Sequence, residues 1–402
     1  MIGADPHERH AMISLEEAQR RVMERAFTVA AETIPLTAAV HRYAATDLRA
    51  MRTQPARDLS AMDGYAIHSD EARQSWKVVG ESAAGAAFPN AITLGEAVRI
   101  FTGAVMPEGA NAVIMQEDVA RRDDTIALLT ATITAPGKHV RPAGSDFAKN
   151  DVMVARGDRL TPAQIGLLAL GGHAEVPVSP RIKVALLSTG DELVPLGSPC
   201  DDQHIPASNA AMLAALLAHE PVELTDLGLV PDRLEALEAA LQAAQDADIL
   251  VTIGGASVGD HDLVRPALIN IGAQLDFWKV AMRPGKPLMC GTLGAQIVLG
   301  LPGNPISAYV TALLFLKPLI AAISGAANPL PTPERCTLGA ALPANSNRAD
   351  HIRAHEAGGV VTPFPSQDSA GLQVFSCTNA LIIRPPNAPM ASKGDQVLII
   401  RP

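Results

Sequence analysis

The sequence between residues 248 and 307 contains two glycine-rich turns, Ile-Gly-Gly-Ala-Ser-Val-Gly-Asp-His-Asp at 253–262 and Gly-Leu-Pro-Gly-Asn-Pro at 300–305. Each turn follows a short apolar run and leads into a segment with helical character. The segment between them brings three cations, Lys279, Arg283 and Lys286. A strand, a glycine turn and a helix start together present backbone N–H groups that bind anions. This stretch therefore predicts a site for phosphate or another oxyanion.

The two turns belong to a longer region in which apolar strands alternate with helices. Strands are predicted at 183–187, 222–227, 249–253, 275–280 and 297–299, and helices at 209–219, 232–247, 263–271 and 306–323. Such alternation is typical of an open, mostly parallel, doubly wound sheet with helices on both faces. Ligands of such sheets bind at the carboxyl ends of the strands. The loops that follow the strands are therefore expected to share one edge.

Carboxylates and glycines gather at that expected edge. The candidates, in chain order, are Glu192, Asp232, Gly254, Gly255, Ser257, Asp262, Pro302, Gly303, Asn304 and Pro305. Carboxylate oxygens suit Mg²⁺, and nearby Lys and Arg suit phosphate, so the combination indicates nucleotide or phosphoryl chemistry. Neither a P-loop nor a complete Gly-x-Gly-x-x-Gly fingerprint is present, which disfavours ordinary ATPases and dinucleotide-binding proteins.

Each of these features also has a purely structural explanation. A tight turn alone would account for Gly254-Gly255, and Asp232 together with Glu235 would cap the helix that follows. Pro302 and Pro305 would shape a turn, and the three cations would form a solvated face. The convergence of four loops, rather than any single residue, favours a binding site.

The flanking regions predict further domains. A capping box at 14–17 begins one helix, another helix is expected at 37–43, and Thr161 begins a third. Short strands separated by turns dominate the regions before 150 and after 327. We therefore expect a discontinuous linking domain at 11–50 and 150–179, an inserted β domain at 51–149, an α/β domain at 180–326 and a C-terminal β barrel at 327–402.

Composition restricts the class of protein. The chain has 402 residues, 48% of them hydrophobic and 18% charged, which excludes a disordered protein. Its net charge of −10 disfavours nonspecific nucleic-acid binding. Four widely spaced cysteines suit a reducing compartment. The polar start predicts no signal peptide, and Lys317-Pro318 interrupts the longest apolar stretch, so we expect a cytoplasmic protein that does not span a membrane.

Seven short motifs occur in a defined order. They are Ser-Ala-Met-Asp-Gly-Tyr-Ala at 60–66, Phe-Thr-Gly-Ala at 101–104, Gly-Ser-Asp at 144–146, Ser-Thr-Gly-Asp-Glu-Leu at 188–193, Gly-Gly-Ala-Ser-Val-Gly at 254–259, Arg-Pro-Gly-Lys-Pro at 283–287 and Gly-Leu-Pro-Gly-Asn-Pro at 300–305. This set resembles the molybdenum insertases of the MoeA and gephyrin E-domain family, from about residue 12 to the end. The resemblance implies a MogA-like α/β domain and a Mg²⁺-dependent transferase that inserts molybdenum from molybdate into adenylylated molybdopterin and releases AMP.

The resemblance also implies catalytic positions. The family's acidic positions and its functional threonine fall on Asp63, Thr102, Asp146, Glu192, Asp232 and Asp262. Its proline pair falls on Pro302 and Pro305, and its basic residues on Lys279 and Arg283. We hypothesise that Glu192, Asp232 and Asp262 hold Mg²⁺, while the basic residues and the 300–305 turn hold anions.

The implied assembly is an elongated homodimer in which the 60–66 loop of one subunit reaches the α/β domain of the other. Expected partners are a molybdopterin adenylyltransferase and the molybdoenzymes, or their chaperones, that accept the cofactor. Leu59, Ser145 and Arg283 depart from the usual family residues, so a paralogue that handles tungstate stays open. Two other functions stay open as well. One is an adenylyltransferase, which is normally this α/β domain alone, and the other is a non-catalytic scaffold like an animal relative that clusters receptors.

Overall fold

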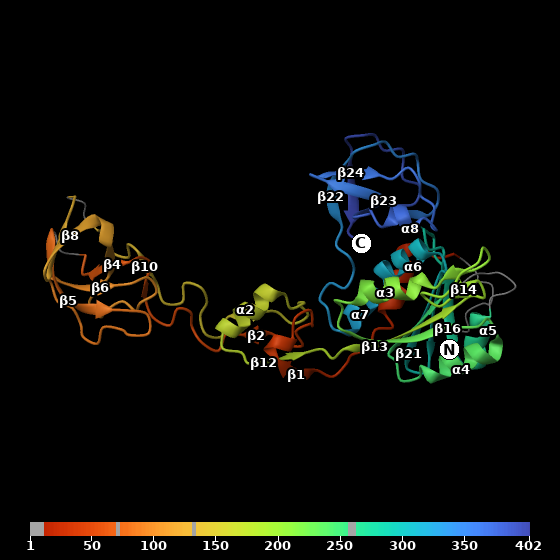
Figure 1. Ribbon diagram of the computed structural model, residues 1–402, viewed down its shortest axis with the longest axis horizontal. Helices are drawn as coiled ribbons and strands as arrows, with labels where there is room; N and C mark the ends of the chain where they lie inside the picture. Colours follow the sequence, from red (N-terminus) through yellow and green to blue (C-terminus); the bar gives the residue numbers. More distant parts are fainter. Residues whose placement is uncertain (1–11, 70–72, 131–133, 256–262) are drawn as a thin grey trace.

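The computed structural model describes residues 12–69, 73–130, 134–255 and 263–402. The molecule is elongated, with a β domain at one end, a small linking domain in the middle and an α/β domain at the other end, beside a C-terminal barrel (Figure 1). The mixed α/β fold class predicted from the sequence is confirmed.

A six-stranded sheet in the order β16-β13-β17-β21-β20-β18 forms the centre of the α/β domain. Its parallel part consists of β16 (Val222–Val230), β13 (Ile182–Thr189), β17 (Ile249–Ile253) and β21 (Gln296–Leu301), and β20 (Pro287–Leu293) and β18 (Gln274–Lys279) extend it through antiparallel pairings. Every residue of β17 is buried, and its side chains alternate between two apolar clusters. Helix α3 (Ser208–Leu217) packs on one face, and α4 (Leu234–Ala243) and α5 (Val264–Asn270) on the other.

A continuous helical segment, Pro305–Ile323, fills the core beneath the face that α3 covers. It comprises α6 (Pro305–Thr311), a π turn η4 (Ala312–Leu316) and α7 (Lys317–Ile323). Among the described residues, this is the one helix long and apolar enough to cross a membrane. Of its apolar 18-residue stretch, 83% is buried inside the protein. Pro318 has no N–H to donate to the carbonyl of Leu314, which explains the local change of helix type.

The N-terminal helix α1 (Leu15–Met23) lies on the α/β domain, although we group its residues with the linking domain from the sequence. Its Gln19 side chain donates a 3.1 Å hydrogen bond to the Leu314 carbonyl that Pro318 leaves unpaired. Asp276 in β18 forms ion pairs with Arg21 (3.0 Å) and Arg25 (2.8 Å). Helix α1 is therefore attached by its contacts to the long core helix and to the sheet.

The linking domain consists of two short antiparallel pairs and one helix. The pairs are β1 (Glu32–Pro35) with β12 (Glu175–Val178), and β2 (Leu48–Arg49) with β11 (Val152–Val154). Helix α2 (Pro162–Leu170) begins with the expected cap, a capping box between Thr161 and Gln164. The helix predicted at 37–43 is wrong: only a 3₁₀ turn, η2 (Leu36–Ala38), forms. His41 then adopts a positive φ of 66°, which a helix cannot contain.

The inserted β domain contains a six-stranded sheet in the order β7-β4-β6-β5-β9-β8. The strands are β4 (Gly64–Ile67), β5 (Ser75–Ser82), β6 (Glu96–Ile100), β7 (Ala112–Met115), β8 (Val119–Arg122) and β9 (Thr125–Leu128), with the 3₁₀ turn η3 (Gln116–Asp118) after β7. A separate pair joins β3 (Leu59–Ser60) to β10 (Val140–Arg141). Short apolar runs between turns predict most of these strands from the sequence.

Five strands close the C-terminal barrel, because β23 pairs with both β24 and β25. They are β22 (Glu334–Leu338), β23 (Ala349–Ala357), β24 (Val360–Pro363), β25 (Ala380–Arg384) and β26 (Gln396–Ile400), and the short helix α8 (Leu372–Phe375) lies between β24 and β25. A two-residue strand of the α/β domain, β19 (Met282–Arg283), pairs with β23. This pairing fixes the basic 279–286 segment against the barrel.

Candidate active site

Asp232 is held at the carboxyl edge of the sheet by Thr189, the last residue of β13. The Thr189 hydroxyl donates to the Asp232 carboxylate and lies 2.9 Å from the Val230 carbonyl. The backbone N–H of Asp232 donates to Asp191 Oδ1 at 3.2 Å. Helix α4 begins at Leu234, with Arg233 as its N-cap and no side-chain cap. The structural explanation of Asp232 as a helix cap is therefore wrong, and its carboxylate faces the strand ends.

Glu192 lies in the loop that follows β13, and a glycine makes room for it. A Cβ placed on Gly190 would lie 2.7 Å and 2.9 Å from the two carboxylate oxygens of Glu192. The Glu192 carbonyl accepts a 2.8 Å hydrogen bond from the Ile205 N–H. The adjoining pair of β14 (Leu193–Val194) with β15 (Ile205–Pro206) fixes the loop. The exposed Glu192 carboxylate is therefore held over the sheet edge by its backbone.

The two glycine turns predicted to converge do lie against each other. Gly254 has a φ of +89°, and a Cβ on it would lie 2.4 Å from the Thr189 carbonyl oxygen. A Cβ on Gly303 would lie 3.7 Å from the Gly254 Cα. Asn209 at the start of α3 donates a 2.6 Å hydrogen bond to the Gly303 carbonyl. Gly255 also lies in this turn, with a φ of +63°, whereas the predicted Ser257 and Asp262 lie outside the described residues.

Hard oxygen ligands are available at this edge. Asp191 and Asp232 each use one carboxylate oxygen in the contacts above, and no hydrogen bond to the other oxygen occurs within the described residues. Glu192 is exposed beside them. Carboxylate oxygens are the ligands that Mg²⁺ prefers, so these side chains are of the chemical type that suits the implied ion. Within the described ranges, no cluster of three or more His, Cys, Asp or Glu is placed to hold a metal.

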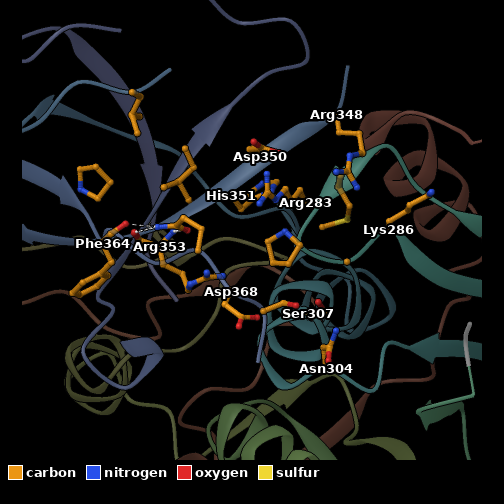
Figure 2. A pocket seen from close by; sticks show the side chains of 18 of the residues that line it. Arg283, Lys286, Asn304, Ser307, Arg348, Asp350, His351, Arg353, Phe364 and Asp368 are labelled. Carbon is orange, nitrogen blue, oxygen red and sulfur yellow. Dashed lines mark hydrogen bonds between the residues drawn. The ribbon is translucent and has the colours of Figure 1, made fainter. Parts of the chain in front are cut away.

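A cavity of about 820 Å³ lies between the α/β domain and the barrel (Figure 2). The α/β domain contributes Arg283 from β19, Lys286 from the turn that follows, and Asn304 and Ser307 from the start of α6. The barrel contributes Arg348, Asp350, His351, Arg353, Phe364 and Asp368. Asn304 follows Gly303 directly, so the 301–305 turn joins this cavity to the sheet edge that holds Asp232.

Arg353 is the most unusual side chain in the cavity wall, because it is only 1% exposed. Two of its nitrogens, Nε and Nη2, are sealed from solvent and have no hydrogen-bond partner. Burial lowers the pKa of the guanidinium, and the charge of Asp368 partly offsets this. A buried cation without a bonded carboxylate is destabilising unless an anion approaches it. The cavity is therefore suited to an oxyanion.

The predicted cations divide between two positions. Arg283 and Lys286 line the cavity, whereas Lys279 does not; its Nζ lies 5.9 Å from the centre of the Trp278 ring. Pro302 is buried, and Pro305 begins α6. Sequence reasoning missed Arg348, Asp350 and Arg353 of the barrel. The signal available for them was a run of charges at 348–353 within a segment that also alternates like a strand.

Asp63 and Thr102 form a pair in the inserted β domain. Asp63 Oδ1 accepts hydrogen bonds from the Thr102 backbone N–H (2.7 Å) and hydroxyl (2.8 Å). These two bonds, the backbone one first, hold the pKa of Asp63 below its usual value. Asp146 lies on the other side of the β3–β10 pair, where its N–H donates to the Gln54 carbonyl. The structure thus brings Asp63 and Thr102 together, but not Asp146 with them.

The inserted β domain and the α/β domain lie at opposite ends of the molecule (Figure 1). Asp63, Thr102 and Asp146 therefore do not approach Glu192 or Asp232 within one chain.

The sequence is similar to known protein families over most of its length. Family models for the MoeA N-terminal region (domain I and II), a probable molybdopterin binding domain and the MoeA C-terminal region (domain IV) match residues 13–172, 185–322 and 335–401. The molybdopterin molybdenumtransferase of Haemophilus influenzae is 41% identical over 318 residues, which cover 78% of each chain. The chain belongs to the molybdopterin molybdenumtransferase family. This confirms the resemblance seen in the sequence, and with it the expectation of an enzyme of the transferase class.

Other members of the molybdopterin molybdenumtransferase family match at greater length. The Nostoc sp. protein is 36% identical over 393 residues, covering 92% of this chain and 88% of that protein. The crystal structure of the molybdopterin biosynthesis MoeA protein from Pyrococcus horikoshii superposes with a TM-score of 0.84 at 27% identity, covering 98% of this chain and all of that one. The likeness therefore extends through all four regions of the fold.

Proposed function

We propose that this protein inserts molybdenum from molybdate into adenylylated molybdopterin, requires Mg²⁺ and releases AMP. The observation that carries the proposal is the convergence at one sheet edge. The Thr189–Asp232 contact places a carboxylate at this edge, and the Gly254–Gly303 contact places glycine backbone beside it. The cationic cavity lies next to both. Family membership supports molybdenum insertion, and these contacts support the finer steps.

Cleavage of the phosphoanhydride would take place at the sheet edge. Asp232, Glu192 and Asp262 would hold Mg²⁺, which supplies charge compensation at the phosphate when it is bound. Gly254 and Gly303 carry no side chains, so a phosphate can approach their backbone closely. Thr189 would keep the Asp232 carboxylate in one orientation, because its hydroxyl is buried and donates to that oxygen.

Molybdate is a tetrahedral dianion, and the neighbouring cavity would bind it. Arg283, Lys286, Arg348 and Arg353 line this cavity. Guanidinium groups bind oxyanions through paired N–H donors. An anion here would also compensate the buried charge of Arg353. The 301–305 turn borders both this cavity and the sheet edge where the phosphate would bind. Both substrates would therefore lie along one surface.

A second copy of the chain would complete the site. Asp63, Thr102 and Asp146 lie at the far end of the molecule from Asp232, so a homodimer would bring them to the partner's edge. The same proposal includes three further expectations. A molybdopterin adenylyltransferase supplies the substrate, molybdoenzymes or their chaperones accept the product, and the reaction takes place in the cytoplasm.

The test uses purified protein with adenylylated molybdopterin and Mg²⁺, with and without molybdate. AMP is followed by chromatography, and active cofactor by reconstitution of an apo-molybdoenzyme. We expect AMP release that depends on both molybdate and Mg²⁺, and its loss in Asp232→Asn. Glu235→Gln is the matched control, because Glu235 is exposed in the first turn of α4. Synthesis of adenylylated molybdopterin from ATP, without insertion, would contradict the proposal.

A further inference from the structure

Asp350 is an acid placed among the cations of the cavity. In the sheet register, Asp350 of β23 pairs with Arg283 of β19 on one side and with Arg384 of β25 on the other. Arg348 lies two residues earlier in the chain. Figure 2 shows Asp350 beside Arg283 and His351 in the cavity wall. Despite these neighbours, the Asp350 carboxylate makes no hydrogen bond or ion pair within the described residues, and its Oδ1 is sealed from solvent.

An ionised carboxylate in this position is unfavourable, because a sealed oxygen without a donor loses its hydration and gains no bond. Burial raises the pKa of Asp350, while the charges of Arg283, Arg348 and Arg384 oppose that rise. Burial also lowers the pKa of the adjacent His351 to about 4, so that imidazole stays neutral near neutral pH. The remaining charged groups of the wall are Lys286, Arg353 and Asp368.

A dianion that enters the cavity would lie close to Asp350 and repel its ionised form. Uptake of one proton from solvent removes this repulsion and converts the carboxyl into a hydrogen-bond donor. The strength of the hydrogen bond that this carboxylic acid donates then determines which oxyanion binds best. Molybdate and tungstate are more basic oxyanions than sulfate, so they accept a stronger hydrogen bond from a carboxylic acid.

We propose that Asp350 selects the oxyanion by binding it as a neutral carboxylic acid, which takes up one proton and donates a hydrogen bond to an anion oxygen. The inference rests on the proposed function, which places molybdate in this cavity. It adds that anion binding consumes a proton, and that a basic oxyanion is preferred to sulfate. The only covalent bond that forms is the O–H bond of Asp350, whose proton comes from solvent, and the metal–oxygen bonds of the anion stay intact.

The experiment measures molybdate binding to the full-length protein by calorimetry between about pH 6 and about pH 8, with dilute molybdate. We expect the wild-type Kd to fall as the pH falls, by up to about tenfold per pH unit for one linked proton. Titrations in two buffers of different ionisation enthalpy count the proton directly and need no variant. Sulfate and tungstate are measured in parallel to obtain selectivity.

Three variants separate Asp350 from its neighbours. Asp350→Asn keeps an N–H donor without a charge, so the pH dependence should disappear while binding persists. Asp350→Ala removes the donor, so the preference for molybdate over sulfate should fall. Asp368→Asn changes the other acid of the same cavity and should keep the wild-type pH dependence. Equal pH slopes in wild type and Asp350→Asn, or no proton uptake by the wild type, would overturn the inference and leave the proposed function intact. Absence of molybdate binding to the wild type would overturn both.

Discussion

Two Asp–Thr pairs lie at opposite ends of the part of the chain that the structure describes, and their surroundings differ. Thr189 ends a buried strand of the parallel sheet and is only 3% exposed, so Asp232 is oriented by the core of its domain. Thr102 is exposed in a loop, and Asp63 accepts from both its hydroxyl and its backbone N–H. A threonine hydroxyl thus donates to an aspartate in both pairs. In the first pair the threonine is fixed by packing in the core, and in the second it lies in an exposed loop.

This difference indicates how each half of the proposed site acquires its environment. Asp232 is next to glycines and acids that its own domain supplies. Asp63 is held by Thr102 of a neighbouring exposed loop, and solvent reaches it in the single chain. A loop of this kind gains a dry, charged environment when another molecule covers it. The proposed dimer would supply that cover.

The largest expected effect comes from separating the two halves on different chains. Asp63→Ala and Glu192→Ala should each lose AMP release, because every site in those homodimers lacks one residue. Mixing the two variants after mild dissociation should restore about one quarter of wild-type activity, since half of random dimers are mixed and each has one intact site. AMP release is the measurement. Absence of recovery, with mixed dimers confirmed by mass, would contradict a site shared between chains.

The hydroxyl contacts themselves should differ in importance. Thr189→Val leaves Asp232 without its donor, and we expect kcat to fall about tenfold to hundredfold, the value of a hydrogen bond to a charged group. Thr102→Val should cost less, because the backbone N–H to Asp63 remains. Thr189→Ser is the matched control and should restore most activity. If the two valine variants had equal kcat, the distinction between the pairs would fail.

Glycine at 254 should matter because of a close contact, not only because of its conformation. Gly254→Ala places a Cβ 2.4 Å from the Thr189 carbonyl, so we expect it to destabilise the α/β domain by about 2 kcal/mol more than Gly272→Ala. Gly272 also has a positive φ, of +96°, but its Cβ would meet nothing within 4 Å. Urea unfolding followed by Trp278 fluorescence in a Trp76→Phe background measures the difference, and equal losses would refute the contact argument.

The pKa of Asp63 offers a direct measure of its loop support. Thr102→Val should raise this pKa toward the ordinary value without reaching it, because the backbone N–H still favours the carboxylate. Carbon-detected NMR titration reads it out. Since the folded pKa is lowered, the stabilising contribution is present above the unfolded value and lost as the pH falls through the folded one. An unchanged pKa in the variant would show that the hydroxyl does not contribute.

The smallest expected effect concerns α1. Gln19→Ala leaves the Leu314 carbonyl unpaired and should lower the free energy of unfolding of the α/β domain by about 1 kcal/mol. Gln242→Ala, on the exposed face of α4, is the control and should have little effect. Both are measured by urea unfolding, and equal values would show that water replaces the Gln19 bond.

The sequence predicts the α/β domain best, because β13, β17 and β21 are mostly apolar runs that lead into glycine turns. The same reasoning fails at Asp232, where a cap pattern is overridden by the Thr189 hydroxyl one strand away. It also fails at 37–43, where His41 turns the chain with a positive φ. In the first case the contact is with a strand that is distant in the sequence, and in the second the His41 N–H donates to the distant Leu160 carbonyl, so local patterns encode neither.

The cationic cavity was predicted only in part. Arg283 and Lys286 follow from the motif at 283–287, but Arg348 and Arg353 come from the barrel. Their position depends on the two-residue pairing of β19 with β23. A pairing this short leaves no periodic signal in the sequence. The positions of Ser257 and Asp262 stay predictions.

The docking of α1 has a consequence for how the protein could be divided or fused. A gene fragment that starts at residue 180 would encode the whole six-stranded sheet, yet it would lack the helix that covers part of the core and pairs with the Leu314 carbonyl. Ile13 also exchanges two backbone hydrogen bonds with the segment at 279–281. Residues 13–25 therefore pack as part of the α/β domain, and a fragment without them would expose the part of the core that Leu15, Ala18 and Val22 cover.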